Sequence, residues 1–443
     1  MSDTAIVASF HRLLQEFSPC FTAPSFSSFL TLMTGWGLNL RRHTITETVR
    51  AAGAVGLKDI TSFHRFFSRG RWLPDALGLV LIRLVVEHLL PANGPIVAVV
   101  DDTLGRHTGK KIAGAAMHRD PLLSTATRVL FHWGHVWVVL GVNVKAFGKT
   151  WCLPILLRLY RTQKQCQREK RSHRKKPELA RELIGLLAST LPDRTIRVLG
   201  DADYTNRSVI QGRPSNVQMI GRARPDAALY APAPPRRRGQ MGRPVLKGKR
   251  LPSPEHQAGR KNAPWQRVKV SVYGKTAWVQ ALVIDALWYR VAGTELVRLV
   301  VVRDFPGHER DDVFVSTDVK LNAKGIIEGY SQRWPLEVTF QECKGRLGFE
   351  DPQNRLEHAV ERTAPMALWA YTLVVLWYVK WGQYTRAARV PHMPWYPSKA
   401  EPAFSDMLAT LRRASWLERL SVPCRDVPTL RKVIRPILEY VAA

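Results

Sequence analysis

The chain has 443 residues, enough for two or three domains, and its 45% hydrophobic content is that of a globular protein rather than a disordered one. Its 66 lysines and arginines against 36 aspartates and glutamates give a formal net charge of +30 and a pI near 10.5. Such a charge favours a polyanionic partner such as nucleic acid, although a ribosomal or membrane-surface protein could share it.

The cysteines and the N-terminus predict a cytoplasmic protein. The five cysteines include no C-x2-C pair, which argues against a disulfide framework and against a zinc site. The N-terminus lacks a basic region followed by an apolar core, so no signal peptide is predicted.

Residues 1–92 are predicted to be helical, because apolar positions recur at intervals of three and four and β-rich runs are few. Two short helical patterns, Thr44–Ala52 and Asp59–Arg69, are compatible with a helix-turn-helix over residues 44–69, with Asp59 as N-cap. A plain helical bundle is the alternative. The cations offered to a DNA groove would be Arg65 and Arg69.

From Pro95 the pattern changes to an α/β core. The sequence predicts three strands, a helix and a fourth strand, at Pro95–Val100, His135–Val144, Thr150–Leu157, Glu178–Thr190 and Thr195–Gly200. Asp101 and Asp102 follow the first strand, and Asp201 follows the fourth. The end of a strand is where an α/β sheet commonly exposes its chemistry.

A basic loop and a β-rich insertion are predicted after Asp201. The stretch 231–252 is rich in Pro, Arg, Lys and Gly, and it contains three consecutive arginines, Arg236, Arg237 and Arg238. Strand-like runs follow at 267–273, 276–284, 295–303 and 313–316. A second basic tract occupies Arg168–Lys176. These tracts are interpreted as DNA-binding, with a purely solubilising role as the alternative.

Four polar residues share one helical face in the segment that follows. If the segment is helical, Tyr330, Arg333, Glu337 and Lys344 lie within roughly 60° of arc and along about 21 Å. That face could hold a metal ion flanked by phosphates, and a solvated helix face is the alternative. Pro335 predicts that the helix starts or kinks there. The apolar stretch 365–381 is predicted to be a buried helix rather than a membrane span, because it is short and contains Lys380.

The spacing Y-x2-R-x3-E-x6-K, preceded by two strand-terminal aspartates, resembles the signature of bacterial insertion-sequence DDE transposases of the YREK group. The resemblance spans roughly residues 95–350. It implies a ribonuclease-H-like mixed α/β sheet with a β-rich insertion, preceded by an all-α region and followed by C-terminal helices.

The resemblance also implies the site. Three carboxylates, Asp102, Asp201 and Glu337, would be catalytic and would hold two Mg²⁺ ions, for which Mn²⁺ can substitute. Each has a neighbouring alternative: Asp101, Asp203 and Glu342. Since strand alternation places Asp101 and Asp102 on opposite sides, only one of them can face the site. Tyr330, Arg333 and Lys344 would grip phosphates, and Trp278 and Trp288 are candidates for stacking on a flipped base.

The expected activity is cleavage at transposon ends and strand transfer into target DNA. The expected partner is double-stranded DNA, bound by a homodimer near the nucleoid, with no membrane and no small-molecule substrate. The alternatives are a nuclease that does not transpose and a repurposed DNA-binding protein. The predicted segments are a DNA-binding region (1–92), the first part of the core (93–222), the loop and insertion (223–318), the catalytic and buried helices (319–383) and a helical C-terminal region (384–443).

Overall fold

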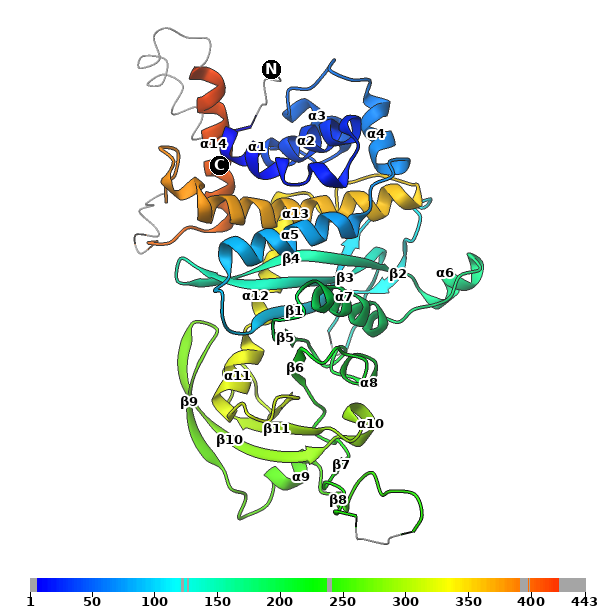
Figure 1. Ribbon diagram of the computed structural model, residues 1–443, viewed down its shortest axis with the longest axis vertical. Coiled ribbons are helices and arrows are strands. Elements are labelled where there is room, and N and C mark those ends of the chain that lie inside the picture. Colours follow the sequence, from blue (N-terminus) through cyan, green and yellow to red (C-terminus); the bar gives the residue numbers. More distant parts are fainter. Residues whose placement is uncertain are drawn as a thin grey trace.

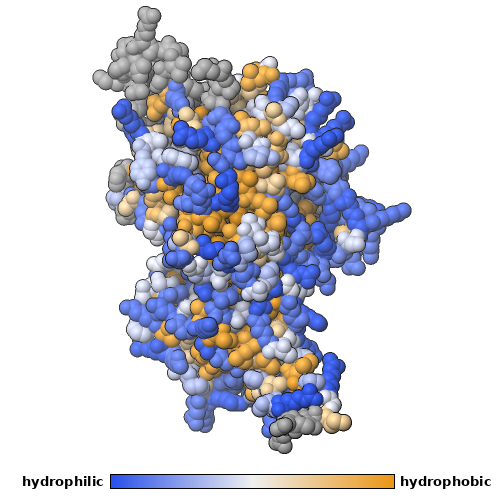
Figure 2. All heavy atoms as spheres, in the orientation of Figure 1, coloured by the Kyte–Doolittle hydropathy of each residue, from blue (hydrophilic) through white to orange (hydrophobic). Residues whose placement is uncertain are grey.

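The computed structural model describes residues 6–421 apart from 121–122, 126, 237–240, 391–396 and 398. In Figure 1 the helices of the N- and C-terminal parts of the chain form the upper layer, a twisted sheet crosses the middle, and the sheet continues into the lower end of the molecule. Hydrophilic side chains cover most of the face drawn in Figure 2, and hydrophobic ones gather over the helical layer and over the lower part of the sheet.

The N-terminal part is helical, as predicted. Its helices are α1 (Ala8–Gln15), α2 (Ala23–Leu38), α3 (Ile45–Ala51), α4 (Ile60–Ser68) and α5 (Pro74–Leu89), with a short 3₁₀ turn at Ser18–Cys20. The Asp59 side chain accepts a hydrogen bond from the Thr61 backbone N–H at 2.8 Å, which confirms the predicted N-cap of α4. The connection between α3 and α4 covers residues 52–59 and is longer than the usual helix-turn-helix turn of about three or four residues.

The core sheet has the strand order β4-β3-β1-β5-β6. Its strands are β1 (Ile96–Arg106), β3 (Phe131–Ala146), β4 (Lys149–Tyr160), β5 (Ile196–Leu199) and β6 (Val217–Arg222), and β2 (Ala116–Arg119) pairs with β3. The pairs β1–β3 and β3–β4 are antiparallel, whereas β1–β5 and β5–β6 are parallel. This mixed sheet is consistent with the predicted ribonuclease-H-like fold.

The predicted β-rich insertion is present, and it extends the core sheet. β12 (Asp312–Ser316) pairs with β6, and β11 (Leu296–Arg303) and β10 (Lys275–Leu287) continue the order outward. β9 (Gln266–Val272) pairs with β10 to make the long curved hairpin visible in Figure 1. The remaining short strands are β7 (Leu229–Tyr230) and β8 (Arg250–Leu251). Core and insertion therefore share one sheet of 12 strands in the described part of the chain.

Helices complete the fold. The longer ones are α7 (Lys176–Thr190), α11 (Ala323–Ser331), α12 (Trp334–Arg346), α13 (Glu357–Lys380) and α14 (Phe404–Ser421). The shorter ones are α6 (Gln163–Arg168), α8 (Arg207–Ile210), α9 (Pro254–Ala258), α10 (Tyr289–Ala292) and the 3₁₀ turn Gly382–Tyr384. The break before Pro335 separates α11 from α12, as predicted. α13 is buried over most of its length, and among the described helices none is long and apolar enough to cross a membrane.

Candidate active site

The two consecutive aspartates lie inside β1, not after it. The prediction that this strand ends at Val100 is wrong, because β3 pairs with β1 from Ala98 to Arg106. The parallel neighbour β5, however, pairs with β1 only up to Val99. The aspartates therefore lie just beyond the end of β5, in the same part of the sheet as Asp201, which follows β5 in sequence.

Asp101 and Asp102 contact different elements on opposite sides of β1. The Asp101 carboxylate accepts a hydrogen bond from Arg333 at 2.6 Å, just before α12. The Asp102 carboxylate accepts one from Lys176 Nζ at the start of α7 and one from the Tyr204 hydroxyl, both at 2.7 Å. Adjacent strand residues alternate between faces, so α12 covers the side of Asp101 and α7 the side of Asp102.

Arg333 joins carboxylates from distant parts of the chain. One guanidinium nitrogen contacts Asp101, and the other lies 2.6 Å from Glu337, one helical turn further along α12. Burial by itself would lower the pKa of Arg333, but Asp101 and the other nearby acidic groups raise it above its usual range. The side chain is 18% exposed and stays charged at neutral pH.

Asp201 is held in a tight turn. Its Oδ1 accepts hydrogen bonds from the backbone N–H groups of Asp203 and Tyr204 at 2.9 and 3.2 Å, and its carbonyl accepts from the Thr205 hydroxyl at 2.6 Å. Gly221 on β6 leaves room for this turn, since a Cβ there would overlap the Thr205 hydroxyl. The side chain of Asp203 is exposed, whereas Asp201 is partly buried.

The electrostatics of the site favour cation binding. Burial raises the pKa of Asp101 to about 7, the charges of Asp201 and Asp102 add to the rise, and Arg333 only partly opposes it. Burial and the charge of Asp203 raise the pKa of Asp201. Carboxyl groups with raised pKa values close to one another mark a place where a bound cation would relieve repulsion.

The donor chemistry of this site suits a hard divalent cation, because carboxylate oxygens are the ligands that Mg²⁺ and Mn²⁺ prefer. Within the described ranges no three His, Cys, Asp or Glu side chains are arranged closely enough to hold a metal ion. Asp101 and Glu337 instead point at Arg333, which neutralises them. If a metal binds here, the residues that would hold it are Asp201, Glu337 and Asp101, the alternative to the predicted Asp102, and Arg333 would have to share Asp101 and Glu337 with the metal.

A comparison with family models identifies the class of protein. The model of a family described as DDE superfamily endonuclease matches residues 16–286, more than half of the chain. The chain belongs to this endonuclease superfamily. Endonucleases of this kind act on DNA and use divalent metal ions. The match includes Asp101, Asp102 and Asp201 and ends before Glu337. A search of curated proteins found no match.

The other predicted phosphate ligands of the endonuclease are partly or fully buried. Tyr330 is 7% exposed, and its ring stacks on Phe314 with centroids 4.4 Å apart. Lys344 Nζ donates to the Leu104 carbonyl of β1 at 2.6 Å, and burial lowers the pKa of Lys344. Lys344 therefore reaches the same strand as Asp101, and Tyr330 packs in the core with its ring centroid 6.0 Å from the Arg333 guanidinium.

The predicted DNA contacts away from the carboxylates differ in exposure. Arg65 and Arg69 are exposed, and the opposite side of α4 is buried through Phe63, Phe66 and Phe67. Arg236 is also exposed, while Arg237 and Arg238 lie outside the described residues. Of the two tryptophans, Trp278 is 52% exposed with the Arg267 guanidinium 4.8 Å from its ring centroid, and Trp288 is buried.

The sequence reasoning missed the roles of Lys176 and Tyr204. Lys176 was visible only as the last residue of a basic tract, and Tyr204 only as a residue near Asp201. Their contacts with Asp102 join residues 74 and 102 positions apart, and such pairing leaves no local signal in one sequence.

Proposed function

We propose that this endonuclease is a DNA transposase of the YREK type, which frees a 3′-hydroxyl at the element end and joins it to target DNA. The observation that carries the proposal is that Arg333 pairs with both Asp101 and Glu337, and that Asp201 follows β5, the strand that lies beside β1. Three distant parts of the chain supply these groups, and DNA binding alone would not need them.

The carboxylates and the Arg333 guanidinium would have different roles in the reaction. Asp101, Asp201 and Glu337 would hold two Mg²⁺ ions, and such ions would activate water and neutralise charge at the phosphate. Water attacks phosphorus and the 3′-oxygen leaves as a hydroxyl. In strand transfer that hydroxyl attacks a target phosphodiester, and the displaced target oxygen takes up the proton. Arg333 has planar donors suited to a phosphate, and Lys344 lies on the same side of α12.

The proposal places DNA along the basic surface of the protein. The exposed Arg65 and Arg69 of the α4 region and the loop led by Arg236 are proposed to contact the backbone outside the cleavage point. Since two element ends must be joined, the DNA complex is proposed to contain a homodimer.

Transposition is distinguished from simple nuclease activity by the fate of pre-cleaved ends. Incubation of the protein with Mg²⁺, end DNA that already carries a 3′-hydroxyl, and a supercoiled target should give covalently joined products. A nuclease on the same core would cut the target without joining the ends to it. A repurposed DNA-binding protein would shift the end DNA in a gel and give neither product.

Replacing Arg236, Arg237 and Arg238 together by alanine should weaken binding to all DNA sequences and lower the slope of affinity against salt concentration by up to about 3. Single-turnover cleavage at saturating DNA should stay near the wild-type rate, because these residues would not touch the scissile phosphate. Fluorescence anisotropy at several salt concentrations gives the slope. An unchanged slope would mean that the loop does not contact DNA.

Proton competition at Asp101 should make divalent-cation binding depend on pH. The pKa of this carboxyl is raised to about 7, so below pH 7 a proton must leave before a cation binds. The affinity for Mn²⁺, measured by calorimetry, should rise up to about tenfold per pH unit between pH 5 and 7 and level off above. In the Asp101→Asn variant this dependence should flatten, and a wild-type-like pH profile in that variant would contradict the assignment.

A further inference from the structure

Both oxygens of the Asp102 carboxylate accept a hydrogen bond from a side chain. Its Oδ2 accepts from Lys176 Nζ and its Oδ1 from the Tyr204 hydroxyl, each at 2.7 Å. The side chain is 19% exposed, and Tyr204 is fully buried. Burial, followed by the charge of Asp102, raises the pKa of Tyr204, so the hydroxyl stays protonated and donates at every pH at which the protein is folded.

Tyr204 connects this carboxylate to the turn that carries Asp201. The Tyr204 backbone N–H donates to Asp201 Oδ1 at 3.2 Å, in the same turn where Asp203 N–H donates to that oxygen at 2.9 Å. The orientation of the Asp201 carboxylate therefore depends on where Tyr204 sits, and the hydroxyl of Tyr204 is fixed to β1 through Asp102.

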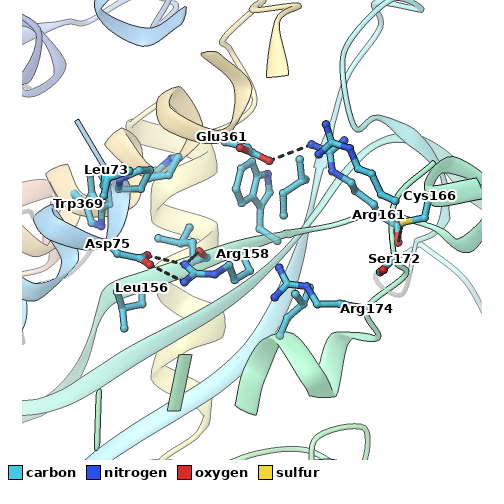
Figure 3. A pocket seen from close by; sticks show the side chains of 17 residues that line it. Leu73, Asp75, Leu156, Arg158, Arg161, Cys166, Ser172, Arg174, Glu361 and Trp369 are labelled. Carbon is cyan, nitrogen blue, oxygen red and sulfur yellow. Dashed lines mark hydrogen bonds and ion pairs between the residues drawn. The ribbon is translucent and has the colours of Figure 1, made fainter. Parts of the chain in front are cut away.

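The third partner, Lys176, lies on a helix that ion pairs join to neighbouring elements. It is the first residue of α7, whose Glu182 pairs with Arg158 of β4 at 2.8 Å. Arg158 pairs in turn with Asp75 of α5 at 2.7 Å, the contact drawn at the cavity in Figure 3. Four arginines line this cavity, and each contacts a carboxylate: Arg158, Arg161, Arg171 and Arg174. These ion pairs join α7, and with it Lys176, to β4 and α5.

We propose that Asp102 is a positioning residue: through its hydrogen bond with Tyr204 it orients the Asp201 carboxylate for the divalent cation, while Lys176 balances its charge. This inference rests on the proposed function. Asp102 would not touch the cation, because its side of β1 is that of Lys176 and Tyr204 and not that of Arg333 and Glu337. The role resembles that of other groups that hydrogen-bond to a metal ligand, whose loss typically costs about 10- to 100-fold in metal affinity.

The test separates cation affinity from the maximal rate. Tyr204→Phe removes only the hydroxyl and should raise the half-saturating Mg²⁺ concentration for cleavage about tenfold, with the maximal single-turnover rate within about threefold of wild type. Asp102→Leu should raise the half-saturating Mg²⁺ concentration by a similar factor. The double variant with Asp102→Leu and Tyr204→Phe should show no larger increase than either single variant. Asp102→Asn keeps an acceptor oxygen for the hydroxyl and should shift the Mg²⁺ requirement by at most about threefold. The matched control is Tyr384→Phe, at a tyrosine that is 79% exposed.

Calorimetric titration with Mn²⁺ alone, without DNA, should show the same order of affinities and does not depend on activity. Equal losses in Asp102→Asn and Asp102→Leu would overturn the proposal, since they would mean that charge and not the hydrogen bond matters. Wild-type behaviour of Tyr204→Phe would also overturn it. If Tyr204→Phe lowers the melting temperature too far for assay, the comparison of Asp102→Asn with Asp102→Leu decides alone. A wild-type protein that cuts no DNA would instead defeat the proposed function, and the Mn²⁺ titration would still test the positioning role.

Discussion

Replacing Asp101 by asparagine should lower the single-turnover rate of DNA cleavage by about a thousandfold, whereas Asp102→Asn should stay within about tenfold of wild type. Asp101 faces α12, where its carboxylate shares Arg333 with Glu337, and Asp102 is enclosed by Lys176 and Tyr204. Loss of a carboxylate that holds a catalytic metal removes several kcal/mol of transition-state stabilisation, and about 4 kcal/mol corresponds to that factor.

Both substitutions remove one negative charge from the same strand, so each is the control for the other. End binding should hold or rise slightly in both, because a negative charge near phosphates is lost. Asp201→Asn and Glu337→Gln should match Asp101→Asn. The opposite pattern, with Asp102→Asn inactive and Asp101→Asn active, would mean that the second aspartate of the pair holds the metal.

Replacing Arg333 by alanine should lower cleavage at saturating DNA by about a hundredfold while DNA affinity barely changes. One charge out of a net +30 contributes little to bulk attraction. Arg333, however, contacts Asp101 and Glu337 at 2.6 Å each, and misplacing the reacting groups by about 1 Å can cost that much in rate.

The control for charge is Arg333→Lys, which keeps the cation but cannot bridge two carboxylates with a planar fork, and it should recover only part of the rate. Lys344→Ala should give a smaller loss of cleavage, since Lys344 is tied to the β1 backbone rather than to the carboxylates. Single-turnover kinetics and the melting temperature should be measured for all three variants. Small and equal losses would mean that Arg333 and Lys344 only help to pack α12 against β1 and do not position the reacting groups.

The resemblance favoured Asp102, and the sequence alone could not show that Asp101 is the aspartate that faces α12. Val99 and Val100 are both fully buried, since β1 is covered on both faces, and such a strand reads as one continuous apolar run without alternation. Strand alternation predicted that the side chains of Asp101 and Asp102 point to opposite faces of β1. Which of the two faces α12 covers is determined by long-range packing. The apolar run ends at Val100, but the pairing of β1 with β3 continues to Arg106. Hydrophobicity alone therefore placed the end of the strand too early.

The polar stripe was predicted in part. Pro335 correctly signalled a helix start, and the spacing of Arg333 and Glu337 brings them together across one turn. Tyr330 belongs to the separate helix α11, so one continuous helical wheel does not give its direction; its ring stacks on Phe314 and lies 6.0 Å from the Arg333 guanidinium. The strands of the insertion were predicted locally, but their continuation of the core sheet rests on the β12–β6 pairing, which no local pattern encodes.

The most direct measurement is the mapping of cuts made by the wild-type protein and by Glu337→Gln in DNA that flanks the protein's own gene, with Mg²⁺ present. We expect defined wild-type cuts that free 3′-hydroxyls at two ends, joined products when target DNA is added, and no cuts by Glu337→Gln, although that variant still binds the ends. Cuts made equally by both proteins, or no cuts by the wild type on any flanking DNA, would contradict a metal-dependent transposase built on Asp101, Asp201 and Glu337.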